Sequence, residues 1–94
     1  MSIPFSSHLS PSADVIVRSV GDEAVLLDLK TERYLGLDAI SARIWQVLTG
    51  GGTLQAAYET LLSEFEVEPE RLRADLEEFV QELIQFGLVE QSKA

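Results

Sequence analysis

Apolar positions in the first part of the chain are spaced as they are in β-strands. A β-branched run covers residues 15–20, and a nearly continuous apolar run covers residues 24–29. Gly21-Asp22 between the two runs predicts a tight hairpin turn, because glycine accepts the backbone angles that such turns require. A second turn over residues 30–32 precedes a short aromatic and aliphatic segment at residues 33–37. The pattern therefore predicts a three-stranded antiparallel meander.

From Asp38 onward the apolar positions recur with the period of an α-helix. Asp38 is a good N-cap for a first helix, which the glycines at residues 50–52 end. Thr53 can cap a second helix, and Pro69 stands at the start of a third, where its missing N–H has no cost. Gly87 predicts the end of that third helix. A meander followed by three helices predicts an α+β domain of the winged helix-turn-helix type.

The two ends of the chain lack this patterning. Residues 1–12 are rich in serine and proline, and we expect a flexible N-terminus there. One domain should follow over residues 13–90, with a flexible C-terminus over residues 91–94, because 94 residues support a single modest core. At the end of the third helix, Leu88 is expected to fold back toward Leu83.

The net charge limits the partners that the protein can have. Sixteen acidic residues outnumber seven basic ones, which gives a formal charge of −9. Binding to duplex DNA usually requires clustered lysine and arginine, whereas the third predicted helix is mainly acidic. Anionic membrane surfaces are disfavoured for the same reason, and no apolar run is long enough to span a bilayer. We therefore expect no nucleic-acid and no membrane partner, although a basic partner is compatible with the charge.

Groups suited to catalysis or metal binding are scarce. The chain has no cysteine, which together with the lack of a signal peptide pattern predicts a cytoplasmic protein. Its one histidine, His8, lies beside Ser6 and Ser7 in the segment expected to be flexible, whereas a nucleophile and its base must be held within hydrogen-bond reach. No calcium-loop or histidine-based metal spacing occurs. We expect a protein that is not an enzyme and uses no cofactor or metal.

The short strand at residues 33–37 is the segment most suggestive of binding. As the last strand of a small meander it should lie at an edge, where unpaired N–H and C=O groups can accept an incoming peptide strand. Gly36 would let another backbone approach closely. Alternatively, Tyr34 and Leu37 simply complete the core. The residues by themselves leave both interpretations open.

Several fragments in order resemble the PqqD-like family of small peptide-binding domains known as RiPP recognition elements. The family typically has a Gly-x-Ala-Val-Leu-Leu-Asp stretch, an Arg-Tyr strand that ends in Leu-Asn, an Ile/Val-Trp pair and a Gly-Leu-Val/Ile close. Glu32 replaces the usual glycine before Arg-Tyr, which suggests a different turn, and Asp38 replaces the usual asparagine as a competent cap. The resemblance covers roughly residues 14 to 90, and the corresponding segments are Gly21 to Asp28, Arg33-Tyr34, Leu37-Asp38, Ile44-Trp45 and Gly87 to Val89.

The resemblance implies that the leader segment of a ribosomal precursor peptide adds as an antiparallel strand beside the third strand. Its apolar side chains would then lie in a groove between that strand and the third helix. Asp75 could hold a basic residue of the leader, or could simply pair with Arg71. The residues that we expect to bind the peptide are Arg33, Tyr34, Leu35, Gly36 and Leu37 on the strand, with Leu72, Asp75, Leu76, Phe79, Val80 and Leu83 on the helix.

Among members of that family, the chain most resembles the stand-alone leader-binding proteins of lasso-peptide biosynthesis. Such a protein would deliver the precursor to a leader peptidase, and a cyclase would act afterwards. One alternative is a PqqD-type peptide chaperone for a radical SAM enzyme in pyrroloquinoline quinone-like biosynthesis. A second is an acidic winged-helix module with a regulatory role. All three interpretations describe a binding protein rather than an enzyme.

Overall fold

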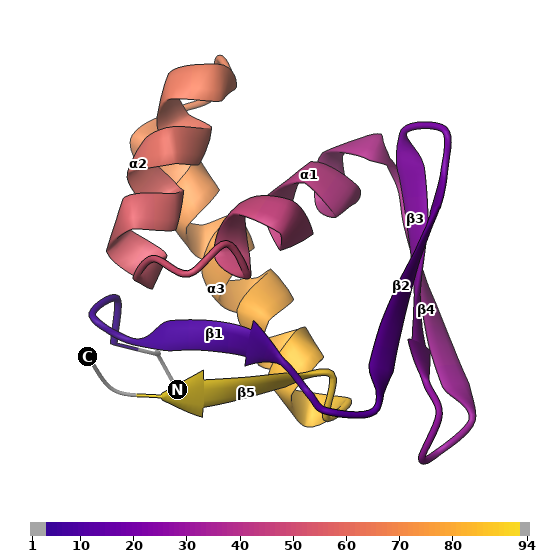
Figure 1. Ribbon diagram of the computed structural model, residues 1–94. Coiled ribbons are helices and arrows are strands. Elements are labelled where there is room, and N and C mark those ends of the chain that lie inside the picture. The colour runs from indigo at the N-terminus through magenta and orange to yellow at the C-terminus, as the bar shows by residue number, and fades with distance from the viewer. Residues whose placement is uncertain (1–3, 93–94) are drawn as a thin grey trace.

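The computed structural model of the protein describes residues 4–92, which fold into two small antiparallel sheets and three helices (Figure 1). The larger sheet has the strand order β2-β3-β4, and the smaller one pairs β1 with β5. The elements along the chain are β1 (His8–Pro11), β2 (Val15–Val20), β3 (Glu23–Asp28), β4 (Arg33–Leu37), α1 (Ala39–Leu48), α2 (Leu54–Glu64), α3 (Pro69–Gln85) and β5 (Val89–Ser92).

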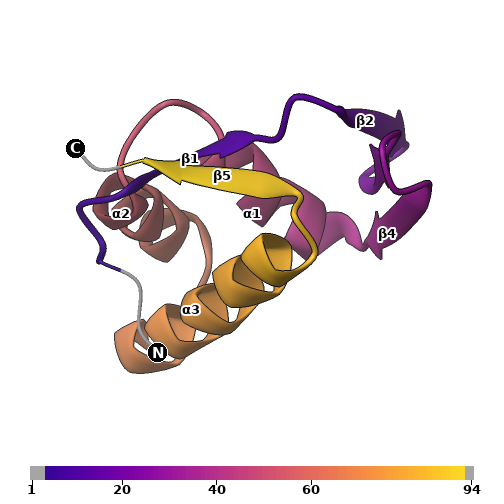
Figure 2. The ribbon, with the colours of Figure 1, turned by 90° about the horizontal axis from the view of Figure 1, so that it is seen from below.

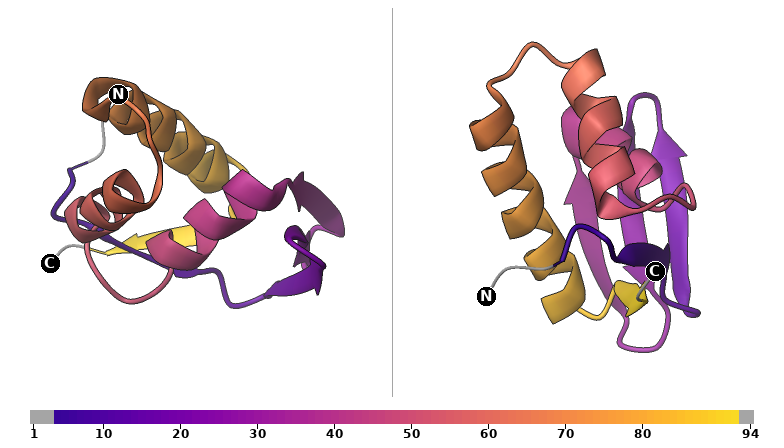
Figure 3. Two further views of the ribbon diagram at one scale, coloured as in Figure 1. Left: turned by 90° about the horizontal axis from the view of Figure 1, so that it is seen from above. Right: turned by 90° about the vertical axis from the view of Figure 1, so that its left-hand side faces the viewer.

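The predicted meander and the α+β class are confirmed. Gly21 has a φ of 63° in the β2–β3 turn, in the region that glycine accepts freely. In the register of the sheet, Leu26 lies opposite Leu35, and Ala24 opposite Leu37. These positions share the face that points toward the helices, and α1 is the helix that lies nearest to it (Figure 3). The other face of this sheet, which we call the outer face, points away from the helices (Figure 1).

Two predicted N-caps start the first two helices. The Asp38 carboxylate accepts a hydrogen bond of 2.8 Å from the Ser41 backbone N–H at the start of α1. The Thr53 hydroxyl accepts one of 3.1 Å from the Ala56 backbone N–H at the start of α2. Each bond satisfies a donor that the helix itself leaves unpaired.

The same cap makes α1 sensitive to acid. The hydrogen bond from the Ser41 backbone N–H lowers the pKa of the Asp38 carboxyl. Because the pKa in the folded state lies below the unfolded value of about 3.9, this contribution to stability is present above that pH and is lost as the pH falls through the folded pKa. We expect Asp38→Asn, which keeps a capping side chain without the charge, to be less stable than the wild type near neutral pH. Urea titrations at decreasing pH should show this difference shrinking in acid; a difference that stays constant would contradict it.

Both predicted ends of α3 are also confirmed. Pro69 is its first residue, and Gly87 follows it with a φ of 71°. The Leu88 backbone N–H donates a hydrogen bond of 2.9 Å to the Leu83 carbonyl, which is the predicted return of the chain. The broad apolar stripe of α3 then faces the centre of the domain. The most deeply buried side chains of the core include Leu26, Leu48, Leu61, Leu76, Val80 and Leu83.

The ends of the chain differ from the sequence prediction of flexible termini over residues 1–12 and 91–94. Residues 8–11 form β1, which pairs with β5 over residues 89–92, so the two strands run side by side (Figure 2). Leu9 is only 3% exposed in the core. The Gln91 side-chain amide donates a hydrogen bond of 3.0 Å to the hydroxyl of the buried Ser7. The remaining positions of the predicted termini, residues 1–3 and 93–94, lie outside the described residues.

Residues before β1 are held by the helices. The Phe5 ring meets the Tyr58 ring of α2 edge-on at 6.0 Å, and the Arg73 guanidinium of α3 lies 3.9 Å from the centre of the Phe5 ring. His8 lies within β1, opposite Ser92 in the register. The histidine of the chain is therefore part of a strand rather than of a flexible segment.

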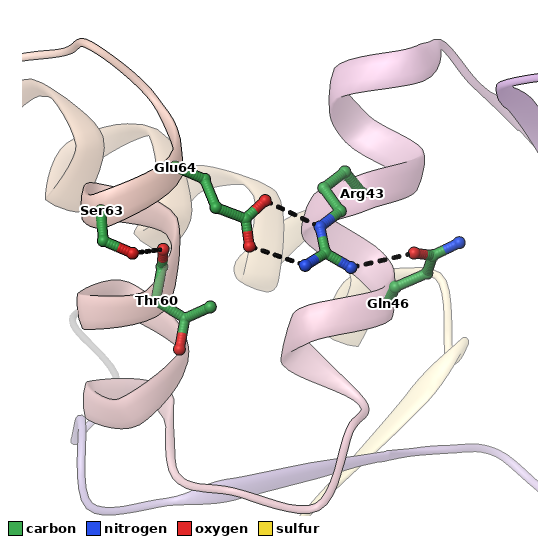
Figure 4. A network of polar contacts seen from close by, with 5 residues as sticks. All are labelled: Arg43, Gln46, Thr60, Ser63 and Glu64. Carbon is green, nitrogen blue, oxygen red and sulfur yellow. Dashed lines mark hydrogen bonds and ion pairs between the residues drawn. The ribbon is translucent and has the colours of Figure 1, made fainter.

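An ion pair links the first two helices (Figure 4). The Arg43 guanidinium on α1 donates two hydrogen bonds, of 2.9 and 2.6 Å, to the Glu64 carboxylate at the end of α2. It donates a third, of 3.2 Å, to the side-chain carbonyl of Gln46. The hydrogen bonds between Arg43 and Glu64 lower the pKa of the Glu64 carboxyl and raise the pKa of the Arg43 guanidinium.

Among the described helices, none is both long and apolar enough to cross a lipid bilayer.

Candidate functional site

Strand β4 has a free edge. It hydrogen-bonds to β3 on one side, and within residues 4–92 no strand pairs with its other side. The prediction that the segment at residues 33–37 is an edge strand is therefore confirmed. Such an edge presents backbone donors and acceptors that can pair with an extended peptide.

A groove of about 390 Å³ lies between the start of β4 and the segment that ends α3. The C-terminal end of α3 is the end nearer β4 (Figure 2). Leu35 and the buried Leu88 contribute apolar surface, and the Phe86 side chain, 40% exposed, adds an aromatic ring. The residues that line the groove are Glu32, Arg33, Tyr34, Leu35, Phe86 and Leu88.

The structure brings three of the predicted strand residues to this groove. Arg33, Tyr34 and Leu35 all line it, and the Tyr34 side chain is 75% exposed. Gly36 is exposed further along the strand, whereas Leu37 is buried in the core. Three of the five predicted strand residues therefore line the groove, whereas the Leu37 side chain lies on the face of β4 that is buried in the core.

The prediction for the third helix needs correction for four residues. Leu72, Leu76, Val80 and Leu83 are almost fully buried in the core, and none of them lines the groove. The reason is that α3 must cover the domain with the centre of its apolar stripe, which leaves only the margins of the stripe for other contacts.

The remaining two helix residues lie on the surface or partly so. Phe79 is half-buried against the core, and Asp75 is exposed. The Asp75 carboxylate lies 4.0 Å from the Arg71 guanidinium, the i,i+4 pairing that is the alternative role for this residue. Phe86 follows Phe79 by seven residues, or nearly two helical turns, so both lie on the same flank of α3.

Three residues of the groove were not among those predicted from the sequence. Phe86 and Leu88 flank Gly87, so they belong to the turn that ends α3 rather than to its periodic stripe. The sequence does contain a signal for Phe86. It is an aromatic residue directly before the glycine that ends the helix, and it does not belong to the apolar stripe that the core needs. Glu32 was assigned to a turn alone.

Glu32, one of the residues that line the groove, has an unusual backbone conformation. Its φ is 59°, and it is the one non-glycine residue with positive φ among those described. Glu32 thus adopts the left-handed conformation that a glycine would accept freely. For a residue with a Cβ this conformation costs about 1–2 kcal/mol.

Replacing Glu32 by glycine is therefore expected to stabilise the fold. We expect the free energy of unfolding to rise by about 0.5–1 kcal/mol, because the relief of strain exceeds the extra freedom that glycine has in the unfolded chain. Thr31→Gly is the matched control in the same turn, where φ is not positive, and it should destabilise. Chemical denaturation of both variants measures the effect, and equal losses of stability would contradict it.

Metal coordination finds no support in this region. Within residues 4–92, no three histidine or acidic side chains gather in a way that could hold a metal ion. The groove instead combines an aromatic and aliphatic lining with two charged residues, Glu32 and Arg33. Such a lining suits the side chains of a peptide that pairs with the strand beside it.

Comparisons with known proteins identify a matching family and two similar solved structures. The family described as Coenzyme PQQ synthesis protein D (PqqD) matches residues 23–89, from the start of β3 to the first residue of β5. A search among curated proteins found no match.

Two solved structures are similar along nearly their whole length. "TbiB1 in Complex with the TbiA(beta) Leader Peptide" is 33% identical with a TM-score of 0.81, covering 86% of this chain and 94% of that one. "Lasso peptide synthetase B1 complexed with the leader peptide" is 26% identical with a TM-score of 0.80, covering 88% of this chain and 98% of that one. Both similar proteins were solved with a leader peptide bound.

Proposed function

The chain belongs to the PqqD family, and from this premise we propose that it binds the leader segment of a ribosomal precursor peptide without catalysing a reaction itself. The observation that carries the proposal is the free edge of β4 beside the groove that Phe86 and Leu88 help to line. The leader peptides present in the two similar structures support it.

Binding would occur by strand addition. The leader lies antiparallel to β4, and backbone hydrogen bonds to residues 33–37 supply affinity that depends little on sequence. Side chains that point toward the groove contact Leu35 and Phe86 and supply specificity. The flank of α3 that carries Phe86 also carries Phe79 and Asp75, which would extend the contact toward the start of the helix. The buried leucines of α3 would act indirectly, by holding this flank in place.

The finer role that we propose is delivery of the bound precursor to a leader peptidase, with a cyclase acting afterwards, in lasso-peptide maturation in the cytoplasm. The match to both B1 structures over more than four-fifths of this chain favours this role. A PqqD-type chaperone that serves a radical enzyme is the second candidate, favoured by the description of the matching family. The two differ in the enzyme that needs the protein, which is a peptidase in one case and a radical enzyme in the other.

A titration with the labelled leader peptide of a precursor encoded in the same gene cluster, once that precursor is identified, tests the proposal. We expect saturable binding, no binding of the same residues in scrambled order, and slower amide hydrogen exchange in β4 after binding. Binding that leaves exchange in β4 unchanged would contradict strand addition, and failure of the leader to bind would contradict the function. Adding the protein to peptidase and precursor should accelerate leader removal, whereas the protein alone should leave the precursor intact.

A further inference from the structure

Apolar side chains are aligned across the outer face of the larger sheet. The register places Ile16 opposite Leu27 and Leu27 opposite Tyr34, so the three form one row across β2, β3 and β4. Leu27 is half-buried, while Ile16 and Tyr34 are exposed. The row ends at Tyr34, on the strand whose other edge is free. It is therefore open to extension by any strand that adds to β4.

Gly36 leaves an open position next to the end of this row. It lies on the same face as Tyr34, two residues along β4, and opposite Val25 of β3. A Cβ placed on Gly36 would meet no atom within 4 Å, and its φ is not in the left-handed region. Neither packing nor backbone conformation within this chain therefore requires glycine, although glycine weakens the interior of a strand.

An added strand must use this face as well as the groove. Successive side chains of a strand point to opposite faces, so every second residue of a peptide paired with β4 lies on the outer face. The peptide residue directly opposite Gly36 lies over the open position, beside the Tyr34 ring and across from Val25. Covering a glycine in a strand with an aromatic side chain from the neighbouring strand is a recognised way of stabilising a sheet.

We infer that the outer face at Gly36 and Val25 is a second subsite, bordered by Tyr34, which also lines the groove. The subsite takes an aromatic or large apolar side chain of the leader on the face of the sheet that points away from the helices. This inference rests on the proposed function and adds the chemistry of one leader position. Recognition is then two-sided. The groove contacts the leader side chains that point to one face of the added strand, and the outer face contacts a side chain that points to the other.

Selection from a library of random displayed peptides tests the inference, with the full-length wild type and three variants as baits. Gly36→Val fills the open position but favours a strand, so it should fold at least as stably as the wild type. Tyr34→Ser removes the exposed ring that flanks the position. Val20→Ser is the matched control, because Val20 is an exposed residue of the outer face on β2, at the opposite side of the sheet from the free edge of β4.

The wild type should enrich peptides with alternating apolar positions, one of which is aromatic or large. Gly36→Val should lose the preference at that single position, keep the others, and bind the wild-type consensus about tenfold more weakly. Tyr34→Ser should lose the same preference, and because Tyr34 also lines the groove it should weaken selection at the neighbouring groove position as well. Val20→Ser should behave as the wild type does.

Three results would overturn the inference. If Gly36→Val and Tyr34→Ser enrich the wild-type consensus with unchanged affinity, the outer face takes no part, while the proposed function stands. If the wild type enriches no peptide that protects the amides of β4 from exchange, the proposed function fails and the subsite with it. If sedimentation shows a dimer that Gly36→Val disrupts, a second copy of this chain occupies the face instead.

Discussion

Replacing Leu9 by alanine is expected to lower the free energy of unfolding by about 2–5 kcal/mol, the range for large-to-small changes in a packed core. Leu9 is 3% exposed and belongs to the same cluster of core residues as the helices. It lies on β1, whose pairing with β5 ties the start of the chain to its end. Because small domains are stable by only about 5–15 kcal/mol, the loss should lower the melting temperature strongly.

Leu29→Ala is the matched control for this variant, because it makes the same chemical change at a side chain that is 60% exposed. Its effect should stay within about 0.5 kcal/mol. Thermal melts and urea titrations of both variants measure the difference. Equal and small losses would contradict the docking of β1 and support a flexible N-terminus.

The largest effect on binding is expected from Phe86→Ala. The Phe86 ring is partly exposed in the groove, so its removal should change stability little but weaken leader binding by about 2 kcal/mol or more, as for other aromatic anchors. Leu83→Ala is the matched comparison, because Leu83 is fully buried three residues earlier. It should cost about 2–5 kcal/mol of stability and leave the affinity of the folded protein unchanged.

Calorimetric unfolding and titration with the labelled leader give both quantities for each variant. A Phe86→Ala protein that binds as the wild type does would remove the groove from the proposed site. Phe79→Ala should fall between the two, since Phe79 is half-buried against the core and lies on the same flank as Phe86. A graded effect along this flank would show how far the leader follows α3.

Features with local signals could be predicted from the sequence. The caps at Asp38 and Thr53 need only a residue three positions away, and the ends of α3 need only Pro69 and Gly87. The edge position of β4 followed from its place as the last strand of the meander. In each case the deciding interaction lies within a few residues along the chain, so the residue types are sufficient.

The groove residues required more than periodicity. The apolar stripe of α3 is wider than the surface that the core covers, and a periodic pattern does not say which margin remains open. The fold buries Leu72, Leu76, Val80 and Leu83, and it leaves Phe86 exposed beside β4. The strain at Glu32 was equally hidden, because a turn sequence does not state the sign of φ at each position.

By itself, the sequence determined the order and type of the central elements, from β2 to the end of α3, and the edge strand at residues 33–37. Only the tertiary structure decided that residues 8–11 pair with residues 89–92, that the end of α3 closes the groove, and that Gly36 faces open space on the outer face. The physical reason is the distance along the chain between the partners. Helix caps and hairpin turns are formed by neighbours in sequence, whereas pairing between the two ends depends on where the whole core has placed them.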